Sequence, residues 1–268
     1  MTLAAPALAG VRVLDFSRML SGPFCTALLA DLGADVIKIE SPGGGDDARH
    51  FAPKSGGESC LFMMVNRNKR SVALDLKSEA GRQVAHRLAE RSDIVVENFR
   101  PGVARRLGVD YASLAAINRR LVYASISGFG QEGPLAHRPA YDIIAQAMGG
   151  IMSVNGSKDG PPTRVGESLG DLAAGLYAAW AILAGLRARE RDGHGQHLDI
   201  AMLDSIFSLL VSALSQYLFT GEIPGRIGNA NPISAPLDSF HAADGELIIA
   251  VANDVMFRRL CQAMDAPE

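Results

Sequence analysis

The 268-residue sequence has few cysteines, a single tryptophan and no marked excess of either charge. Its three cysteines, Cys25, Cys60 and Cys261, are odd in number and far apart. This argues against a disulfide-rich secreted scaffold and predicts reduced, mostly buried thiols. The net charge of −3 offers no basic surface for nucleic acid. The N-terminal residues lack a cationic segment ahead of apolar ones, so we expect no secretory signal and a cytoplasmic protein.

Long hydrophobic runs are scarce as well. The conspicuous one follows Asp171, where fifteen residues from Leu172 to Leu186 carry no charge. The run is shorter than a bilayer crossing requires, and Trp180 and several glycines interrupt it. It predicts a helix buried on all sides of a soluble protein, with no membrane as partner.

The sequence is rich in alternating strand and helix signals. Short β-branched runs predict strands at residues 11–16, 34–40, 71–76, 93–99 and 121–127. Helical patterns lie between them, at residues 24–33, 77–92 and 111–120. This order predicts an α/β fold, an open and mostly parallel sheet with flanking helices, in a Rossmann-like large domain.

The domain organisation changes after residue 203. Residues 1–203 are expected to form the large α/β domain, and residues 204–236 a long helix and a linker. Residues 237–268, with a hairpin turn at Asp244-Gly245, resemble the beginning of a smaller α+β domain that is too short to form its own core.

A glycine-rich segment raises a second possibility, a dinucleotide site. "GFGQEG", Gly128 to Gly133, matches G-x-G-x-x-G and follows a predicted strand. Such a site needs a helix to begin there, and Pro134 and Pro139 disfavour one. A glycine-rich loop is the better interpretation. His194 and His197 have no companion ligands at a suitable spacing, so no metal site is predicted.

Basic residues gather near the carboxyl ends of the predicted strands, at residues 66–71, at Lys77 and at residues 97–106. In open α/β sheets this edge binds ligands, and arginine and lysine suit phosphates or carboxylates. Solvated surface charge is an equally good explanation for any one of them.

Asp171 has two interpretations. As an N-cap, its side chain would bind the first amides of the apolar helix and remain ionised. As a carboxylate at a pocket wall, it would be a nucleophile. Spacing alone does not choose between them.

Seven segments carry a family resemblance: "GVRVLDFSRMLSGPFCTALLADLGADVIKIE", "NRNKRSVALDLKSEAGR", "DIVVENFRPG", "YASISGFGQEGP", "RPAYDIIAQAMGG", "ESLGDLAAGLYAAWAILAGL" and "GHGQHLDIAMLDS". In this order they resemble the class III CoA-transferases, the CaiB/BaiF family, which includes formyl-CoA, succinyl-CoA and carnitine-type enzymes. The resemblance implies that Asp171 attacks an acyl-CoA thioester. An aspartyl anhydride and an aspartyl-CoA thioester then carry CoA to an acceptor carboxylic acid.

The resemblance also implies a CoA site without a permanent cofactor. By this resemblance, Asn98 and Phe99 contact the ribose or the adenine side of CoA, and Arg106 contacts a phosphate. Leu74 and Lys77 match positions that flank the adenine. The loop at the thioester end maps to Met19, Leu20 and Ser21, with Leu20 where many members carry glutamine. Tyr141 stands in the cofactor site where racemases of the same fold carry histidine, which favours a transferase over an acyl-CoA racemase or isomerase.

Members of the family are longer and form interlocked homodimers. The resemblance therefore implies that this sequence is a fragment or a shortened homologue, and that alone it is weakly active or inactive. A non-catalytic CoA-binding homologue is the third alternative.

Overall fold

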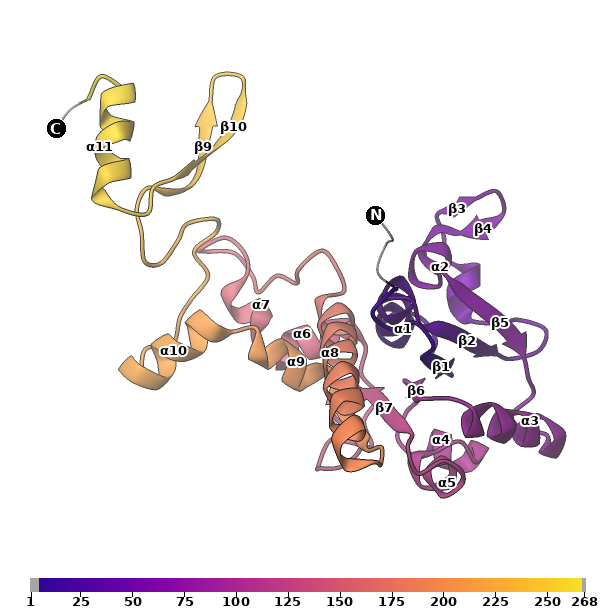
Figure 1. The fold of residues 1–268 in the computed structure, drawn as a ribbon. Coiled ribbons are helices and arrows are strands. Elements are labelled where there is room, and N and C mark those ends of the chain that lie inside the picture. The colour runs from indigo at the N-terminus through magenta and orange to yellow at the C-terminus, as the bar shows by residue number, and fades with distance from the viewer. Residues whose placement is uncertain (1–4, 267–268) are drawn as a thin grey trace. The chain divides into compact units, whose positions relative to one another are not determined.

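The computed structural model describes residues 5–266 (Figure 1). Contacts divide the chain into two units: unit 1 comprises Met1–Gly149 and Glu167–Leu209, and unit 2 comprises Gly150–Gly166 and Leu210–Glu268. The segment Gly150–Gly166, which the sequence gives no reason to separate from the large domain, thus belongs with the C-terminal residues. The two units are described one at a time.

Unit 1 is built on a six-stranded parallel sheet in the order β5-β2-β1-β6-β7-β8. The strands are β1 (Arg12–Asp15), β2 (Asp35–Glu40), β5 (Lys69–Ala73), β6 (Ile94–Glu97), β7 (Val122–Ser127) and β8 (His197–Ala201). The predicted α/β class with a mostly parallel sheet is confirmed. The sequence analysis missed β8, which is short and only partly buried.

Helices cover both faces of this sheet. On one face α3 (Glu79–Glu90), α4 (Val103–Leu107) and α5 (Tyr111–Ile117) enclose a core of alternate strand side chains. Helices α1 (Ser21–Asp31) and α8 (Leu169–Asp192) pack against each other and against the sheet (Figure 1). Strand order reverses between β1 and β6, which is where doubly wound sheets of this kind open a crevice.

Helix α8 is buried on one side only, so the prediction of a helix buried all round is wrong. Leu176 is 54 % exposed and Trp180 is 69 % exposed. Within the described residues, α8 alone and the pair α9–α10 together are long and apolar enough to cross a membrane. Half of the most apolar stretch of α8 is nevertheless buried within the protein, as in the core helix of a soluble domain.

Smaller elements complete unit 1. The long Gly/Pro/Ser loop after β2 contains the 3₁₀ helix η1 (Asp47–His50) and a short hairpin, and α2 follows it. These and the remaining elements are β3 (Lys54–Ser55), β4 (Glu58–Ser59), α2 (Cys60–Val65), α6 (Asp142–Met148) and α9 (Met202–Ser208). Cys25 is buried, Cys60 is partly buried, and burial raises the pKa of the Cys25 thiol.

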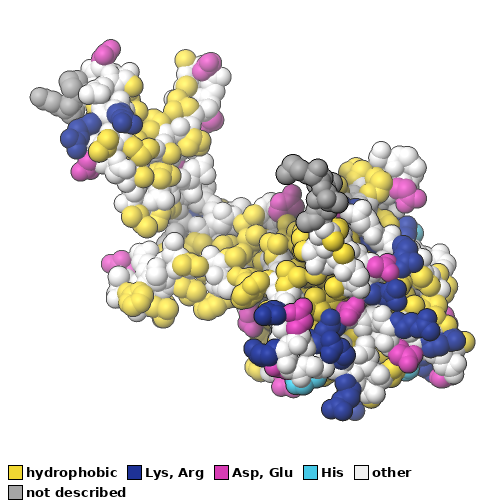
Figure 2. All heavy atoms as spheres, viewed as in Figure 1, with side chains coloured by type: hydrophobic (Ala, Val, Ile, Leu, Met, Phe, Trp, Pro, Cys, Tyr) yellow, Lys and Arg dark blue, Asp and Glu magenta, His cyan; other side chains and the backbone are white. Residues whose placement is uncertain are grey.

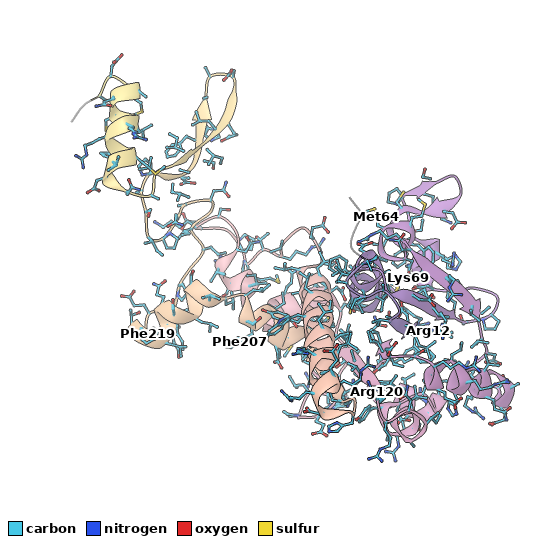
Figure 3. The ribbon with its side chains drawn as sticks, viewed as in Figure 1. Arg12, Met64, Lys69, Arg120, Phe207 and Phe219 are labelled. Carbon is cyan, nitrogen blue, oxygen red and sulfur yellow. The ribbon has the colours of Figure 1, made fainter. Side chains whose placement is uncertain are left out.

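Unit 2 contains α7 (Ile151–Val154), α10 (Val211–Thr220), the antiparallel pair β9 (Leu237–Ala242) and β10 (Gly245–Ala250), and α11 (Asp254–Ala263). The continuous helix expected after residue 203 is instead two helices, α9 and α10, separated at Leu209 and Leu210. Phe207 and Phe219, labelled in Figure 3, are exposed on α9 and α10 respectively.

Candidate active site

A cleft of about 730 Å³ lies in unit 1 at the carboxyl ends of β1, β6 and β7. Three strand-end loops line it: Arg18, Met19, Leu20 and Ser21 after β1; Asn98, Phe99 and Arg100 after β6; and Ile126, Ser127 and Gly128 at the end of β7. Residues from Arg138 to Tyr141, together with Ser168, Asp171 and Met202, line it as well. The cleft therefore occupies the position where the strand order of a doubly wound sheet reverses and ligands bind.

Asp171 is the third residue of α8, and the N-cap position is Ser168, whose side chain makes no capping bond. The N-cap interpretation of Asp171 is therefore wrong. The pKa of Asp171 is raised to about 6: burial raises it most, the nearby charge of Asp142 raises it as well, and a hydrogen bond from the Ser21 hydroxyl opposes both. Its pKa is thus raised, whereas capping amides would lower it, and the carboxyl is still mostly ionised near pH 7.

Asp142, on α6, stabilises the start of α8 from outside. Its Oδ1 accepts from the backbone N–H of Gly170 at 2.7 Å, and its Oδ2 accepts from Nε2 of Gln146, also at 2.7 Å. Nε2 of Gln146 also donates to the backbone oxygen of Glu167 at 3.2 Å. A Cβ on Gly170 would come within 3.1 Å of the Asp142 Oδ1 atom, so glycine allows this close contact. The sequence analysis did not single out Asp142.

The loop after β1 is held by buried ion pairs. Lys38 Nζ lies 2.8 Å from Asp46 Oδ2 and donates to the backbone oxygen of Ser17, also at 2.8 Å. Asp46 Oδ1 accepts from the backbone N–H of Met19 at 3.0 Å, and Met19 has a φ of 68°. A non-glycine residue in this conformation persists only where its surroundings hold it, which the Lys38–Asp46 pair does here.

A second buried pair lies beneath the same loop. Lys69 Nζ, labelled in Figure 3, is 3.1 Å from Asp15 Oδ2, and Thr26 donates to the same oxygen at 2.6 Å. Burial raises the pKa of Asp15, but the charges of Lys69 and Lys38 outweigh it and hold that pKa below its ordinary value. Buried ion pairs thus lie at the carboxyl end of β1, beneath the loop that lines the cleft.

Behind the loop after β6 lies Glu97, which is buried. Its Oε2 accepts from the backbone N–H of Phe99 at 2.7 Å, and it hydrogen-bonds to Ser125. Burial raises the pKa of Glu97 to about 7, and the charge of Asp199 adds to this effect. Asp199 itself accepts from the backbone N–H of Gln131 at 2.8 Å. This amide of the glycine-rich loop is therefore already paired within the protein.

Three arginines stand at the cleft: Arg18, Arg100 and Arg138. Arg100 belongs to the basic segment 97–106 noted in the sequence, whereas Arg18 and Arg138 were not predicted. All three are exposed, and Arg18 lies 3.6 Å from Asp47 in a surface ion pair. Figure 2 shows further Lys and Arg side chains over the region of α3 to α5. Such guanidinium groups bind the carboxylates and phosphates of anionic ligands.

One buried side-chain atom of the cleft has no partner among the described residues. The hydroxyl of Ser127 is buried, with the residue 7 % exposed, and it makes no hydrogen bond with any described residue. An unsatisfied buried hydroxyl is costly, so its position in a cleft indicates a ligand contact. Among residues 5–266, no three His, Cys, Asp or Glu side chains gather as metal ligands.

The structure brings together seven of the ten site residues predicted from the sequence. Met19, Leu20, Ser21, Asn98, Phe99, Tyr141 and Asp171 all line the one cleft. Leu74, Lys77 and Arg106 lie outside its lining; Leu74 packs against the core beneath α3, while Lys77 and Arg106 are exposed. Contacts of all ten residues with CoA remain predictions.

Comparison with known proteins identifies the class. The model of CoA-transferase family III matches residues 8–268. The chain is 50 % identical over 260 residues to the acetyl-CoA:oxalate CoA-transferase of Acetobacter aceti, covering 97 % of this chain and 67 % of the relative. It is 43 % identical over 266 residues to the succinate–glutarate CoA-transferase of Agrobacterium fabrum, covering 97 % and 66 %.

A solved structure agrees with these relatives. The crystal structure of a CaiB/BaiF family protein from Brucella suis matches with a TM-score of 0.91 and 41 % identity, over 99 % of this chain and 71 % of that one. The chain belongs to CoA-transferase family III, as its motifs predicted. It spans about two thirds of the length of the curated relatives that it matches.

Proposed function

We propose that the protein transfers CoA between an acyl-CoA thioester and a carboxylic acid, with Asp171 as the nucleophile. The observation that carries this proposal is the position of Asp171: its carboxyl lines the cleft at the reversal of strand order, in the first turn of α8, with a hydrogen bond from Ser21. The family membership and the names of the relatives support the same reaction.

The reaction proceeds by exchange of carboxylate and thiolate. The Asp171 carboxylate attacks the thioester carbonyl, the C–S bond breaks, and an aspartyl–acyl anhydride and CoA thiolate form. The thiolate attacks the aspartyl carbonyl, which releases the first acid and leaves an aspartyl-CoA thioester. The acceptor carboxylate attacks that thioester, forming a new anhydride and thiolate. The thiolate then attacks the acceptor's carbonyl, forming the product thioester and restoring Asp171.

The electrostatics of the site suit this chemistry. A carboxyl with a pKa of about 6 is mostly ionised near pH 7, yet it is more basic than an ordinary aspartate. A more basic carboxylate is the better nucleophile toward a carbonyl, and the surrounding protein replaces the water that would otherwise solvate it. Each step exchanges one anion for another, so no proton has to enter or leave.

We propose dicarboxylic acids as the substrate class. The relatives are named for oxalate, glutarate, succinate and mesaconate, which all carry two carboxyl groups. A second carboxylate on the acyl group needs a cation beside the cleft, and Arg18, Arg100 and Arg138 are candidates. CoA itself is a substrate in this proposal, and no resident cofactor is required.

We also propose a cytoplasmic homodimer. Helices α6, α8 and α9 of unit 1 carry apolar side chains that are 48–69 % exposed: Ile143, Met148, Leu176, Trp180 and Phe207. Figure 2 shows hydrophobic side chains over this region. Exposed apolar surface of this extent is typical of a protein interface. Sedimentation of the chain tests the dimer.

The function is tested with a panel of acyl-CoA donors and acceptor acids, using the chain both as given and extended to the length of its relatives, with thioester products identified by mass spectrometry. We expect exchange with dicarboxylic acids, weak or absent in the chain as given, and its loss in Asp171→Asn. Hydroxylamine added during turnover should inactivate the protein and leave a hydroxamate at Asp171. Normal exchange by Asp171→Asn would refute the mechanism.

Two other outcomes would point to other functions. Deuterium incorporation at Cα without any acceptor acid would indicate a racemase, although Tyr141, which is highly exposed, is a weak base at neutral pH. CoA binding without exchange across the panel would indicate a non-catalytic CoA-binding protein.

A further inference from the structure

A chain of hydrogen bonds joins the loop after β6, the start of α1 and Asp171. Asn98 Nδ2 donates to Ser21 Oγ at 3.2 Å, and the Ser21 hydroxyl in turn acts on the Asp171 carboxyl as a hydrogen-bond donor that lowers its pKa. Ser21 is the first residue of α1 and is only 4 % exposed. The sequence analysis expected Ser21 and Asn98 to contact CoA, and the structure shows that both side chains already have protein partners.

The direction of each bond follows from donor chemistry. The backbone N–H of Arg18 donates to Asn98 Oδ1 at 2.8 Å. Because a backbone N–H can only donate, this atom of the Asn98 side chain is the oxygen, and the other is the NH₂ group. That group donates to the backbone oxygen of Arg18 at 2.7 Å and to Ser21 Oγ. Because Ser21 Oγ accepts from Asn98, its own hydrogen is free to point at the Asp171 carboxylate.

Backbone packing supports the same contact independently. Asp171 and Gly175 are one helical turn apart, on the side of α8 that faces α1. A Cβ on Gly175 would lie 2.7 Å from the backbone oxygen of Ser21, so glycine is what lets the two helices approach this closely. The approach places the Ser21 hydroxyl beside the first turn of α8.

We propose that Ser21 is a positioning residue of the transferase, whose hydroxyl, oriented by Asn98, holds the Asp171 carboxylate toward the cleft. This inference rests on the proposed role of Asp171 as nucleophile. A bond donated to the ionised carboxylate stabilises that form, so Ser21 also lowers the pKa of Asp171 against the effects of burial and Asp142.

The other elements packed against the start of α8 supply no second group that lowers the pKa of Asp171. α6 contributes the negative charge of Asp142, while α1 has no acidic residue in its first turn. α9 carries Asp204, which is exposed. Of these groups, Ser21 is the one that lowers the pKa of Asp171, and its removal should therefore be visible in a titration.

The experiment compares Ser21→Ala with the unaltered chain by two measurements. The first is the carboxyl ¹³C chemical shift of Asp171 against pH in chain labelled with ¹³C-aspartate, the signal being assigned by its absence in Asp171→Asn. We expect Ser21→Ala to move the titration midpoint upward by about one pH unit. This measurement does not depend on turnover.

The second measurement is kcat/KM for CoA exchange between pH 5.5 and 8.5. At pH 6 we expect the kcat/KM of Ser21→Ala to be roughly fivefold to tenfold lower than that of the unaltered chain. At pH 8.5 the difference in kcat/KM should be smaller, because Asp171 is ionised in both proteins. Ser21→Thr keeps the hydroxyl and should restore both the titration midpoint and the pH profile.

The matched control is Ser92→Ala. Ser92 is also 4 % exposed, and its hydroxyl donates to the backbone oxygen of Leu88 at 2.8 Å, outside the cleft lining. The Ser92→Ala variant should be less stable, as expected when a buried hydroxyl that donates a hydrogen bond is removed, but the titration midpoint of Asp171 should not change. An unchanged midpoint in Ser21→Ala, with Asp171→Asn inactive, would overturn this inference and leave the proposed function intact. Exchange that persists in Asp171→Asn would overturn the proposed function itself.

Discussion

Replacing Gly175 with alanine tests how closely α1 and α8 must approach. The new methyl would lie 2.7 Å from the backbone oxygen of Ser21 and 3.0 Å from Cδ1 of Phe24, so backbone has to move. Overpacking of this kind costs about 1–3 kcal/mol, while the change from glycine to alanine within a helix gains about 1 kcal/mol. We expect a net loss of about 1 kcal/mol in the free energy of unfolding.

The assay is urea denaturation followed by circular dichroism, together with CoA exchange. Separation of α1 from α8 also lengthens the Ser21–Asp171 contact, so kcat/KM at pH 6 should fall by up to about tenfold, the loss expected when Ser21→Ala removes that contact. The exposed Ala184 on the same helix supplies a control, because Ala184→Gly should cost about 1 kcal/mol by helix propensity alone. If Gly175→Ala were more stable than the unaltered chain and fully active, the close approach would not be needed.

Three further predictions follow from the site. Asp142→Asn removes the charge that raises the pKa of Asp171, so the acidic limb of kcat/KM against pH should move to lower pH; movement to higher pH would contradict this. Ser127→Ala removes a hydroxyl without a partner, so it should raise the KM for acyl-CoA while the urea midpoint is unchanged or higher. The raised pKa of buried Glu97 means that the folded state holds its proton more tightly than the unfolded state. The free energy of unfolding should therefore fall as pH rises from about 4.5 to about 7, and Glu97→Gln, measured by urea denaturation at pH 5 and pH 8, should remove that dependence.

Much of the sheet could be predicted from the sequence, because its central strands are buried on both faces. Residues of β6 and β7 are buried throughout and rich in β-branched and apolar side chains, which predict strands wherever they pack. β8 alternates exposed and buried positions over five residues, a weak signal that was missed. The break between α9 and α10 was missed as well, since hydrophobic residues continue through Leu209 and Leu210 without a proline or glycine.

Site residues that belong to a local sequence motif could be predicted. Site residues that act through a contact between two distant segments could not. Asp171 stands out by its place ahead of an uncharged run and by the family resemblance. Asp142 carries no such signal, although its carboxylate accepts a hydrogen bond from Gly170 across 28 positions of sequence. Arg18 and Arg138 at the cleft were missed because a surface arginine and a ligand-binding arginine have the same sequence pattern.

By itself the sequence determined the α/β class, most of the strands, the family and the identity of the candidate nucleophile. These depend on local periodicity and on motifs, which are properties of neighbouring residues. Only the tertiary structure decided that Asp171 is not a cap, that its pKa is raised, and that Ser21 and Asn98 are bonded to the protein. These depend on burial and on the approach of α1, α6 and α8, which bring together groups far apart in the chain and remove the water between them.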